Sequence, residues 1–293
     1  MPSGNTRRIL RHLPFLLKRT LLSSFDDNLY AIAKGAAYSS ILSFFPVLTS
    51  AATLLVQTKA DFVARTLYHF LNEVVPPGTD DVVIEHFKAA GQRSNALVVV
   101  AMLLSLWAAS SVMKSLMQGF HAAYRVPRSR SFWRESGIAI GMVFMAAVPL
   151  VGASALLVFG GQVEDMILHW LKVDPILNPI AGLWEFLSHA TRYLIALGAV
   201  ISITGTLYYF GPYRKQRWSA VWPGAMFATL LWFGTTLGFG WYVRHMAHYN
   251  VMYGSLGTGI ALLVWMYLIS LIAILGCEFN AECERFQSAF IAT

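Results

Sequence analysis

The apolar run from Tyr253 to Cys277 constrains the fold most strongly, because it carries no charged residue. A helix rises about 1.5 Å per residue, so about 20 apolar residues cross the roughly 30 Å hydrocarbon core of a bilayer. A buried helix in a soluble protein rarely stays apolar on every side for so long. We therefore predict a transmembrane helix here. The charged content of only 13%, against about 25% in soluble domains, extends that prediction to the rest of the chain.

Five further segments are apolar over the length that a membrane span requires. The mean hydropathy of +0.55 agrees with a chain made mostly of such spans. We predict an all-α, polytopic membrane protein with six transmembrane helices in a single domain over residues 35–282. A basic cytoplasmic or interfacial segment, residues 1–34, precedes this domain, and a cytoplasmic tail, residues 283–293, follows it. The predicted spans cover residues 35–56, 95–117, 137–160, 193–210, 219–243 and 254–277.

The basic residues indicate how the spans are oriented. With the N-terminus inside, 15 of the 22 lysines and arginines fall on the cytoplasmic side and 6 fall on the other side. Cytoplasmic loops carry an excess of positive charge in membrane proteins. Both termini are therefore expected in the cytoplasm.

Two segments outside the spans have helical patterns. Residues 57–93 carry an amphipathic pattern broken by Pro76, Pro77 and Gly78, which predicts an extracytoplasmic helical hairpin between spans one and two. Residues 7–25 combine leucines at helical spacing with five basic residues, a pattern typical of an interfacial amphipathic helix on an anionic membrane. Those leucines are Leu10, Leu13, Leu17 and Leu21.

The first span is unusually rich in small and hydroxyl-bearing residues. Ser39, Ser43 and Pro46 fall on one face at helical spacing. One interpretation is a close helix-packing face with a proline kink. The other is a polar wall beside a cavity, because kinked spans often line one. The sequence alone leaves both interpretations open.

Small residues and polar residues near the span ends suggest where helices approach and where a ligand could bind. Glycines let a neighbouring helix come close. The glycines expected at close contacts are Gly35, Gly254, Gly257 and Gly259. A cavity is expected, if one forms, among spans one, two, five and six. Its candidate contacts are Tyr38, Ser39, Ser43, Pro46, Trp107, Ser111, Tyr253 and Ser255.

Three charged residues are expected at similar depth near the cytoplasmic side of the membrane. Lys34 enters the first span, Lys114 leaves the second and Glu278 leaves the sixth. Charges at membrane depth are costly and often functional, and we expect Glu278 to pair with one or both lysines. This intramembrane cluster is either a structural clamp, with lysines that reach the interface, or a gate or anionic headgroup site.

The polar residues do not form a recognisable catalytic cluster. Metal-dependent hydrolysis needs grouped His, Asp or Glu ligands. Among the eight histidines only His245 and His248 are close in sequence, and no acidic residue lies beside them. No phosphate-binding loop of the G-x-x-x-x-G-K-[ST] type occurs. Cys277 and Cys283 are expected to stay reduced in the cytoplasm. We therefore expect no metal, no cofactor and no enzymatic activity.

Four segments carry a family pattern. They are GAAYSSILSFFPVL at residues 35–48, LYYFGPY at 207–213, WPGAMFATLLWFG at 222–234 and YGSLGTGIALLVWMYLISLIAILGCEFNAE at 253–282. In order and spacing they resemble the YihY/BrkB family of bacterial inner-membrane proteins. The resemblance covers most of the chain, from about residue 25 to 285. It implies six spans in a bacterial inner membrane with both termini inside. Members of the family have been tied to serum resistance and suspected of transport or envelope-lipid roles. Their older ribonuclease BN label has no support in these residues.

The favoured function is a secondary transporter or flippase for a lipid or an amphipathic, anionic solute of the cell envelope. A non-catalytic scaffold for envelope-assembly enzymes is the alternative, and a membrane enzyme is the weakest candidate. The expected partners are membrane lipids, with anionic headgroups at the basic cytoplasmic loops. A homo-oligomer is left open, and nucleic acid is not expected.

Overall fold

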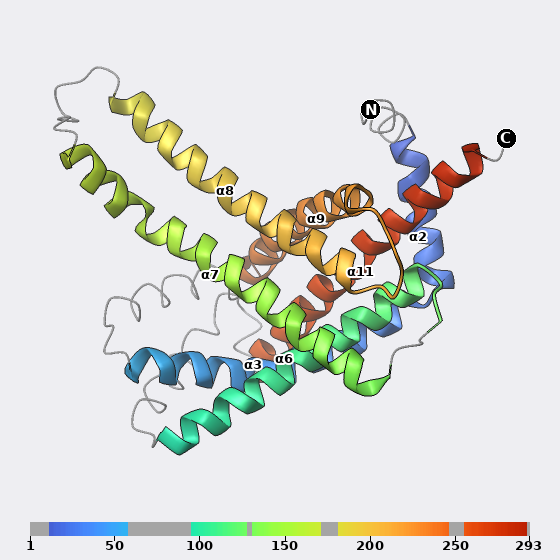
Figure 1. Ribbon diagram of the computed structural model, residues 1–293, viewed down its shortest axis with the longest axis horizontal. Helices are drawn as coiled ribbons and strands as arrows, with labels where there is room; N and C mark the ends of the chain where they lie inside the picture. Colours follow the sequence, from blue (N-terminus) through green and yellow to red (C-terminus); the bar gives the residue numbers. More distant parts are fainter. Residues whose placement is uncertain (1–11, 58–94, 128–130, 171–180, 246–254, 292–293) are drawn as a thin grey trace.

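The computed structural model describes residues 12–57, 95–127, 131–170, 181–245 and 255–291. Within these ranges the chain forms seven helices and no strand. Figure 1 shows their arrangement. The helices are α2 (Leu13–Asp26), α3 (Leu29–Gln57), α6 (Asn95–Ala123), α7 (Phe132–Trp170), α8 (Ala181–Phe210), α9 (Trp218–His245) and α11 (Ser255–Ile291).

Six of these helices are long and apolar enough to cross a membrane, which confirms the predicted all-α, six-span architecture. The helices run further than the predicted spans, and α11 in particular continues well beyond Cys277. The hairpin expected over residues 57–93 lies outside the described residues, except for Gln57 at the end of α3. The membrane-crossing candidates are Leu29–Ser50, Val99–Ala123, Phe132–Gly152, Ala190–Phe210, Trp218–Val243 and Gly259–Ala289.

A helix, α2, covers residues 13–26 of the segment where the interfacial helix is expected, and its place at the membrane surface stays a prediction. Pro14 lies in its first turn, where a proline costs no intrahelical hydrogen bond. The helix ends at Asp26, and the chain turns through Asn28 with a left-handed φ of 54° before α3 begins. Asparagine tolerates that conformation better than most residues. The turn directs α2 at a steep angle to α3 (Figure 1).

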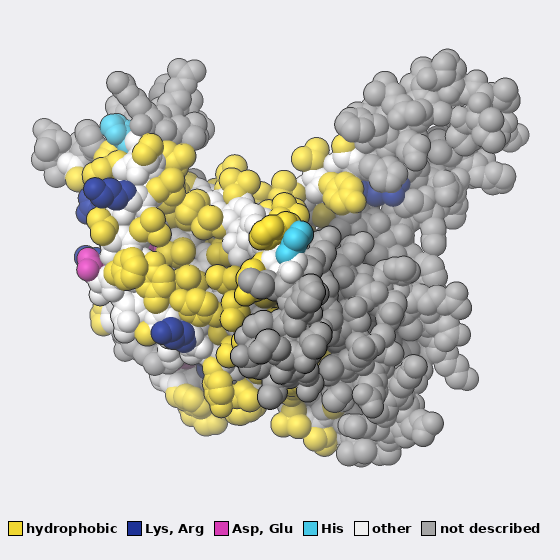
Figure 2. Space-filling view, turned by 180° about the vertical axis from the view of Figure 1, so that it is seen from behind, with side chains coloured by type: hydrophobic (Ala, Val, Ile, Leu, Met, Phe, Trp, Pro, Cys, Tyr) yellow, Lys and Arg dark blue, Asp and Glu magenta, His cyan; other side chains and the backbone are white. Residues whose placement is uncertain are grey.

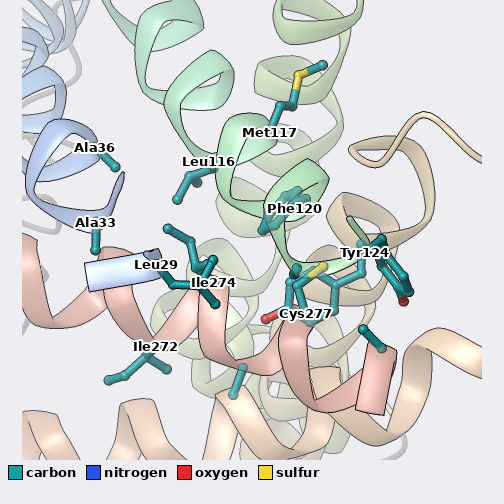
Figure 3. Close-up of a cluster of buried hydrophobic side chains, with 14 of the residues drawn as sticks. Leu29, Ala33, Ala36, Leu116, Met117, Phe120, Tyr124, Ile272, Ile274 and Cys277 are labelled. Atoms are coloured by element: carbon teal, nitrogen blue, oxygen red, sulfur yellow. The ribbon is translucent and has the colours of Figure 1, made fainter. Parts of the chain in front are cut away.

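The chain packs most closely at one end of the molecule, which we call the basic end. It carries α2 and the last turns of α6, α8 and α11 (Figure 1). A buried core there takes side chains from all six spans, and Figure 3 shows part of it. Because lipid is as apolar as these side chains, close packing rather than removal from water holds the helices together. The largest side chains of the core are Tyr208, Phe120, Leu29, Met117, Met142 and Ile274.

Away from the basic end the spans separate. α3 packs along α6, and α7 packs along α8. Figure 1 shows these two pairs diverging from each other. Large apolar side chains of the separated spans are exposed, as helices facing lipid require. They include Phe45, Val47, Leu103, Trp107, Val148, Val151, Tyr193, Leu194, Leu237, Trp241, Ile260 and Leu263.

Glycines let α9 and α11 approach each other closely within the basic end. A Cβ atom added to Gly224 would overlap the carbonyl oxygen of Gly276, and one added to Gly276 would overlap the hydroxyl of Tyr208. Asn280 fastens the crossing. Its Oδ1 accepts a hydrogen bond from the Gly224 N–H at 2.6 Å, and its Nδ2 donates to the Val221 carbonyl at 3.0 Å. This crossing fixes the rotation of α11 and therefore the direction of its polar side chains.

Candidate functional site

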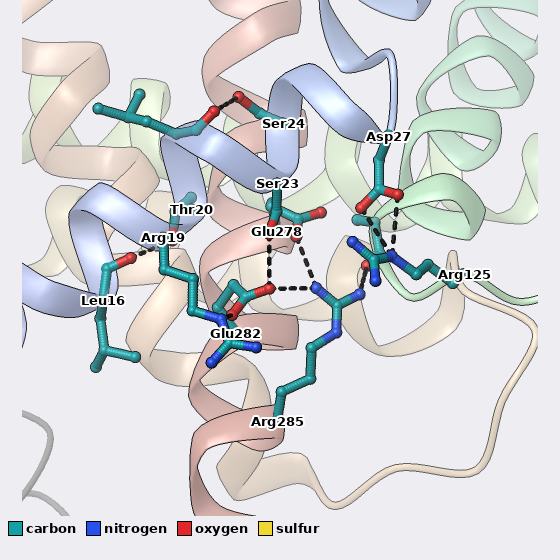
Figure 4. Close-up of polar contacts among 12 residues, drawn as sticks. Leu16, Arg19, Thr20, Ser23, Ser24, Asp27, Arg125, Glu278, Glu282 and Arg285 are labelled. Atoms are coloured by element: carbon teal, nitrogen blue, oxygen red, sulfur yellow. Dashed lines mark hydrogen bonds and ion pairs between the residues drawn. The ribbon is translucent and has the colours of Figure 1, made fainter.

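Two carboxylates are buried one helical turn apart in the last part of α11. Glu278 is 0% exposed and Glu282 is 1% exposed. Charged groups in such surroundings must be paired, because water cannot solvate them. Arg285 provides the pairing (Figure 4). Its Nη1 lies 3.0 Å from Glu278 Oε1 and also forms an ion pair with Glu282.

The N-terminal helix α2 supplies two more contacts to Glu282. Arg19 Nε lies 2.6 Å from Glu282 Oε2, and the Ser23 hydroxyl donates to Glu282 Oε1 at 2.9 Å. The spacing of Arg19 and Ser23, four residues apart, puts both side chains on the side of α2 that faces α11. The Arg19 side chain nevertheless remains 45% exposed. We call Arg19, Ser23, Glu278, Glu282 and Arg285 the latch.

The latch also reaches the end of α6. Arg285 Nη2 donates to the Ala123 carbonyl at 2.6 Å, one of the carbonyls that a helix end leaves without an intrahelical partner. The chain then turns through Arg125, which has a left-handed φ of 53° and backbone hydrogen bonds of the Schellman type. The latch therefore joins α2, α6 and α11.

A second ion pair lies beside the latch. Arg125 Nε donates to both carboxylate oxygens of Asp27, at 3.0 and 3.2 Å. This hydrogen bond raises the pKa of the Arg125 guanidinium, which therefore stays charged. Asp27 stands directly before Asn28 at the junction of α2 and α3. Both sides of this ion pair thus involve a left-handed non-glycine residue, at a cost of about 1–3 kcal/mol each. One is Arg125 itself, and the other is Asn28, next to Asp27.

A third group holds α11 from the other side. The Arg214 guanidinium carbon lies 4.4 Å from the centre of the Tyr124 ring, and Arg214 forms an ion pair with Glu284. Burial raises the pKa of the Tyr124 hydroxyl well above its ordinary value, so this group stays neutral. Arg214 belongs to the basic turn between α8 and α9, so this contact ties that turn to α11.

The formal charges of the latch balance, with two carboxylates against two guanidinium groups. The hydrogen-bonding capacity of the latch is not fully used, because Glu278 Oε2 has no hydrogen-bond partner within the described part of the chain. Desolvation makes buried ion pairs weak contributors to net stability, whereas removal of one partner is costly. The arrangement can therefore hold three helices together by contacts that separate again when the helices move.

The structure gives Glu278 a different partner from the expected lysines. Its ion partner is Arg285 on the same helix. Lys34 is exposed on α3, and Lys114 Nζ lies 5.0 Å from the centre of the Phe132 ring. The expected Lys34–Lys114–Glu278 pairing is thus replaced, because rotation of α3 and α6 directs both lysines away from α11. Exposed Lys34 agrees with a side chain that reaches the interface.

One serine of the first span contacts a neighbouring helix, and another is buried with its hydroxyl bonded to its own helix. Ser39 Oγ lies 3.1 Å from Ser115 Oγ of α6, and the buried Ser43 donates to the Ser40 carbonyl of its own helix at 2.9 Å. Pro46 is half-buried and Tyr38 is exposed. These contacts favour the packing interpretation at Ser39 and Ser43.

The other cavity candidates do not form one cluster in the described structure. Trp107 is exposed on α6, and the carbonyl of half-buried Ser111 accepts a hydrogen bond from Ser115. Ser255 begins α11, but its side chain lies outside the description, as does the whole of Tyr253. A role for these residues in a cavity stays a prediction.

Two of the four glycines predicted at close helix contacts, Gly35 and Gly259, have open space around them in the described structure. A Cβ atom on Gly35 or Gly259 would meet no atom within 4 Å, so neither glycine lies at a close contact with the described residues. Gly257 is buried, and Gly254 lies outside the described residues. The close approach lies instead at Gly224 and Gly276, where α9 crosses α11.

Sequence reasoning missed most of the latch. Glu278, Glu282 and Arg285 share one helical face by spacing, a signal that could have indicated their contact. Nothing in the sequence placed Arg19 or Ser23 against that face, because they lie at the other end of the chain. Within the described residues no group of three or more His, Cys, Asp or Glu side chains could hold a metal ion.

Comparisons with known proteins agree on a membrane family. The family model described as "Virulence factor BrkB" matches residues 22–290. YfkH of Bacillus subtilis, whose name describes it as ribonuclease-like, is 29% identical over 269 residues, covering 85% of this chain and 88% of YfkH. A protein of Tolumonas auensis named "UPF0761 membrane protein" is 27% identical over 281 residues, covering 93% and 88% of the two chains. A UPF0761 membrane protein of Pseudoalteromonas translucida is 24% identical over 273 residues, covering 93% and 87%. No solved structure matches the chain.

Proposed function

Because the chain belongs to the BrkB family of integral membrane proteins, we propose that it is a secondary transporter or flippase. Its cargo is a lipid or an amphipathic, anionic solute, and its location is the bacterial inner membrane with both termini in the cytoplasm. The protein is proposed to act without enzymatic chemistry and without a cofactor. The following observations support this proposal.

The unequal packing of the two ends carries the proposal. All six spans share one core at the basic end, whereas the pairs α3–α6 and α7–α8 diverge at the other end (Figure 1). Alternating access needs helices that pack at one end and separate at the other, around a site between them. Separated apolar helices also offer a lateral path to a cargo that partitions into lipid.

The latch supports the proposal because it lies at the basic end, where the spans pack together. A gate must be stable when closed and must open without covalent change. Ion pairs that join α2, α6 and α11 meet both needs, since small shifts between packed elements can exchange one set of contacts for another. We propose that the latch is the inner gate.

A vesicle assay tests transport directly. The full-length protein is reconstituted into liposomes that carry a fluorescent phospholipid, and the fraction protected from a membrane-impermeant reductant is followed with time. Wild-type protein is expected to move the lipid faster than empty vesicles do, and Glu282→Gln is expected to change that rate several-fold by weakening the closed gate. Glu284→Gln, on the same helix but outside the latch, is the matched control. Wild-type protein that moves neither lipid nor ions would overturn the proposal.

A second candidate is a scaffold for envelope-assembly enzymes. The observation that favours it is the use of Ser39 and Ser115 in a helix contact, because hydroxyl groups spent on packing do not line a path. Stable co-purification of envelope enzymes, together with normal growth of cells in which the Ser39 and Ser115 hydroxyls are removed, would favour the scaffold over transport.

A further inference from the structure

The N-terminal helix α2 buries hydroxyl-bearing side chains and exposes large apolar ones, which is the reverse of a surface helix on a soluble protein. Its buried side carries Leu16 with three hydroxyl-bearing residues, Thr20, Ser23 and Ser24. Its outward side is apolar. The outward side chains of Phe15, Leu21, Leu22 and Phe25 are 50%, 51%, 57% and 67% exposed.

This outward side is not the side that the leucine pattern predicted. Leu13 and Leu17 are half-buried against α11, in a small cluster with Leu16 and Phe279. Leu10 lies outside the described residues. Two of the patterned leucines, Leu13 and Leu17, are therefore used in the contact with α11. This contact leaves a different apolar face largely exposed among the described residues, although the Phe25 ring stacks on Tyr30 with centroids 4.5 Å apart and the Phe15 ring lies 6.1 Å from that of Phe286.

Basic groups accompany the exposed apolar face. Lys18 is exposed and lies three residues after Phe15 and four before Leu22, a spacing that puts all three on one side of the helix. A lysine stem can lie along apolar surface while its ammonium group reaches the headgroup layer. Arg19 lies at the edge of this face and is half exposed although it pairs with Glu282. The exposed carboxylate of Asp26 lies at the far end of the helix.

The position of α2 fits the surface layer of a membrane. α2 stands at the basic end and crosses the general direction of the spans (Figure 1). Figure 2 shows hydrophobic side chains over much of the described surface of one face, with basic side chains set among them. The other exposed apolar helices of the molecule face lipid. The exposed face of α2 is therefore expected to contact lipid as well.

We propose that α2 lies in the surface layer of the membrane and binds an anionic phospholipid. Phe15, Leu22 and Phe25 lie among the acyl chains, and Lys18 and Arg19 hold the headgroup phosphate. Amphipathic helices bind anionic membranes through this combination of buried apolar area and basic charge. Because Arg19 also pairs with Glu282, the headgroup and the latch share one guanidinium group. The lipid site does not depend on whether the protein transports a cargo.

The depth of α2 can be measured in nanodiscs that contain the full-length protein and phosphatidylglycerol. A nitroxide label on Leu22→Cys is expected to be more accessible to oxygen, which concentrates in lipid, than to a water-soluble nickel chelate. A label on Ser131→Cys, exposed in the turn before α7, is expected to show the opposite order. A Leu22 label reached by the nickel chelate as readily as the Ser131 label would place the face in water and overturn the proposal. A label reached by neither reagent would indicate a protein partner and also overturn it.

The headgroup site can be tested with spin-labelled lipids. The preference for phosphatidylglycerol over phosphatidylcholine is expected to fall about fivefold in Lys18→Gln, the loss expected for one cation near an anionic surface. Lys18→Gln leaves the latch intact, so a folding defect does not confuse the result. Lys18→Arg, which keeps a positive charge at the same position, is the control and is expected to keep the preference. An unchanged preference in Lys18→Gln, or an equal loss in Lys18→Arg, would overturn the headgroup site.

Discussion

At the scale of single residues, Arg285 carries most of the organisation at the basic end. One guanidinium group contacts Glu278, Glu282 and the Ala123 carbonyl. Its planar shape and several donors allow these contacts at once, which a lysine could not reproduce. Glu278 is acceptable in a buried position because this group faces it, and Glu282 is also held by Arg19 and Ser23.

Replacing Glu282 by glutamine is expected to lower the free energy of unfolding by about 2 kcal/mol. This is less than the roughly 3–5 kcal/mol for breaking a fully buried pair, because half-exposed Arg19 can turn to solvent. Equilibrium unfolding in mixed micelles measures the change. Glu284→Gln, whose side chain is 42% exposed, should cost no more than about 1 kcal/mol. Equal costs for the two variants would show that burial of Glu282 is not what matters.

The left-handed turn after α6 predicts an unusual order of stability at residue 125. Alanine and glycine both remove the ion pair with Asp27, but only alanine has a Cβ atom that opposes a φ of 53°. Arg125→Gly is therefore expected to be more stable than Arg125→Ala by about 1 kcal/mol. Unfolding midpoints of the two variants, with Asp27→Asn as the reference for loss of the pair alone, test this. An alanine variant at least as stable as the glycine variant would contradict the left-handed turn.

At the scale of elements, the crossing of α9 and α11 positions the latch. Gly224 and Gly276 face each other, and Asn280 bridges the crossing with two hydrogen bonds. Asn280 lies between Glu278 and Glu282 in sequence. The same crossing therefore directs Asn280 toward α9 and the two glutamates toward Arg285 and α2.

Adding a methyl group at this crossing is expected to separate the two helices. Gly224→Ala should lower the free energy of unfolding by about 1–3 kcal/mol through overpacking. Gly234→Ala, in the same helix but with open space around it, should be neutral or slightly stabilising, because alanine favours helix. Thermal unfolding of both variants distinguishes the outcomes. A neutral Gly224→Ala would mean that the close approach does not exist.

The contact between α3 and α6 can be trapped covalently. Ser39 Oγ and Ser115 Oγ are 3.1 Å apart, so Ser39→Cys with Ser115→Cys should form a disulfide on mild oxidation. Tyr38→Cys with Ser115→Cys should not, because Tyr38 is exposed away from the buried side of its helix. Mass spectrometry of the digested protein detects the bond. If the crosslinked protein still moves lipid in vesicles, the serines only pack; loss of movement would instead favour a polar wall.

At the scale of the whole molecule, the basic end is closed and the opposite end is divided. The ion pairs at the closed end come from α2, α6, α11 and the turn after α8, so distant parts of the chain stabilise one region. Among the described residues the separated pairs expose a large apolar surface, which lipid is expected to cover. Lipid composition is therefore expected to influence this protein more than it would influence a closed bundle.

The proposed sidedness predicts where reporters will be active. Fluorescent protein fused after Thr293 should fold and fluoresce, because the basic end is proposed to face the cytoplasm. Alkaline phosphatase inserted between α7 and α8 should be active, because that connection is proposed to be exported. Fusions at both sites with both reporters give reciprocal controls. An active phosphatase after Thr293 would reverse the proposed orientation.

The class and the number of spans followed from the sequence alone. Hydropathy is a property of each segment by itself, and a span needs only enough apolar residues in a row to cross the bilayer. The apolar run ending at Cys277 therefore predicted a membrane protein. Together with five similar runs it predicted the six membrane-spanning helices of the structure. The burial of Glu278 did not follow in the same way, because Lys34 was expected at a similar depth and is exposed.

The tertiary structure alone decided which side chains meet. A partner depends on how each helix is rotated and where it crosses its neighbours, and segment hydropathy contains neither quantity. Glu278 therefore met Arg285 rather than Lys34 or Lys114. The leucines of α2 turned toward α11, which left its aromatic side exposed. The close crossing at Gly224 and Gly276 fixes the rotation of α11, because two backbones can approach so closely only where no Cβ atom separates them.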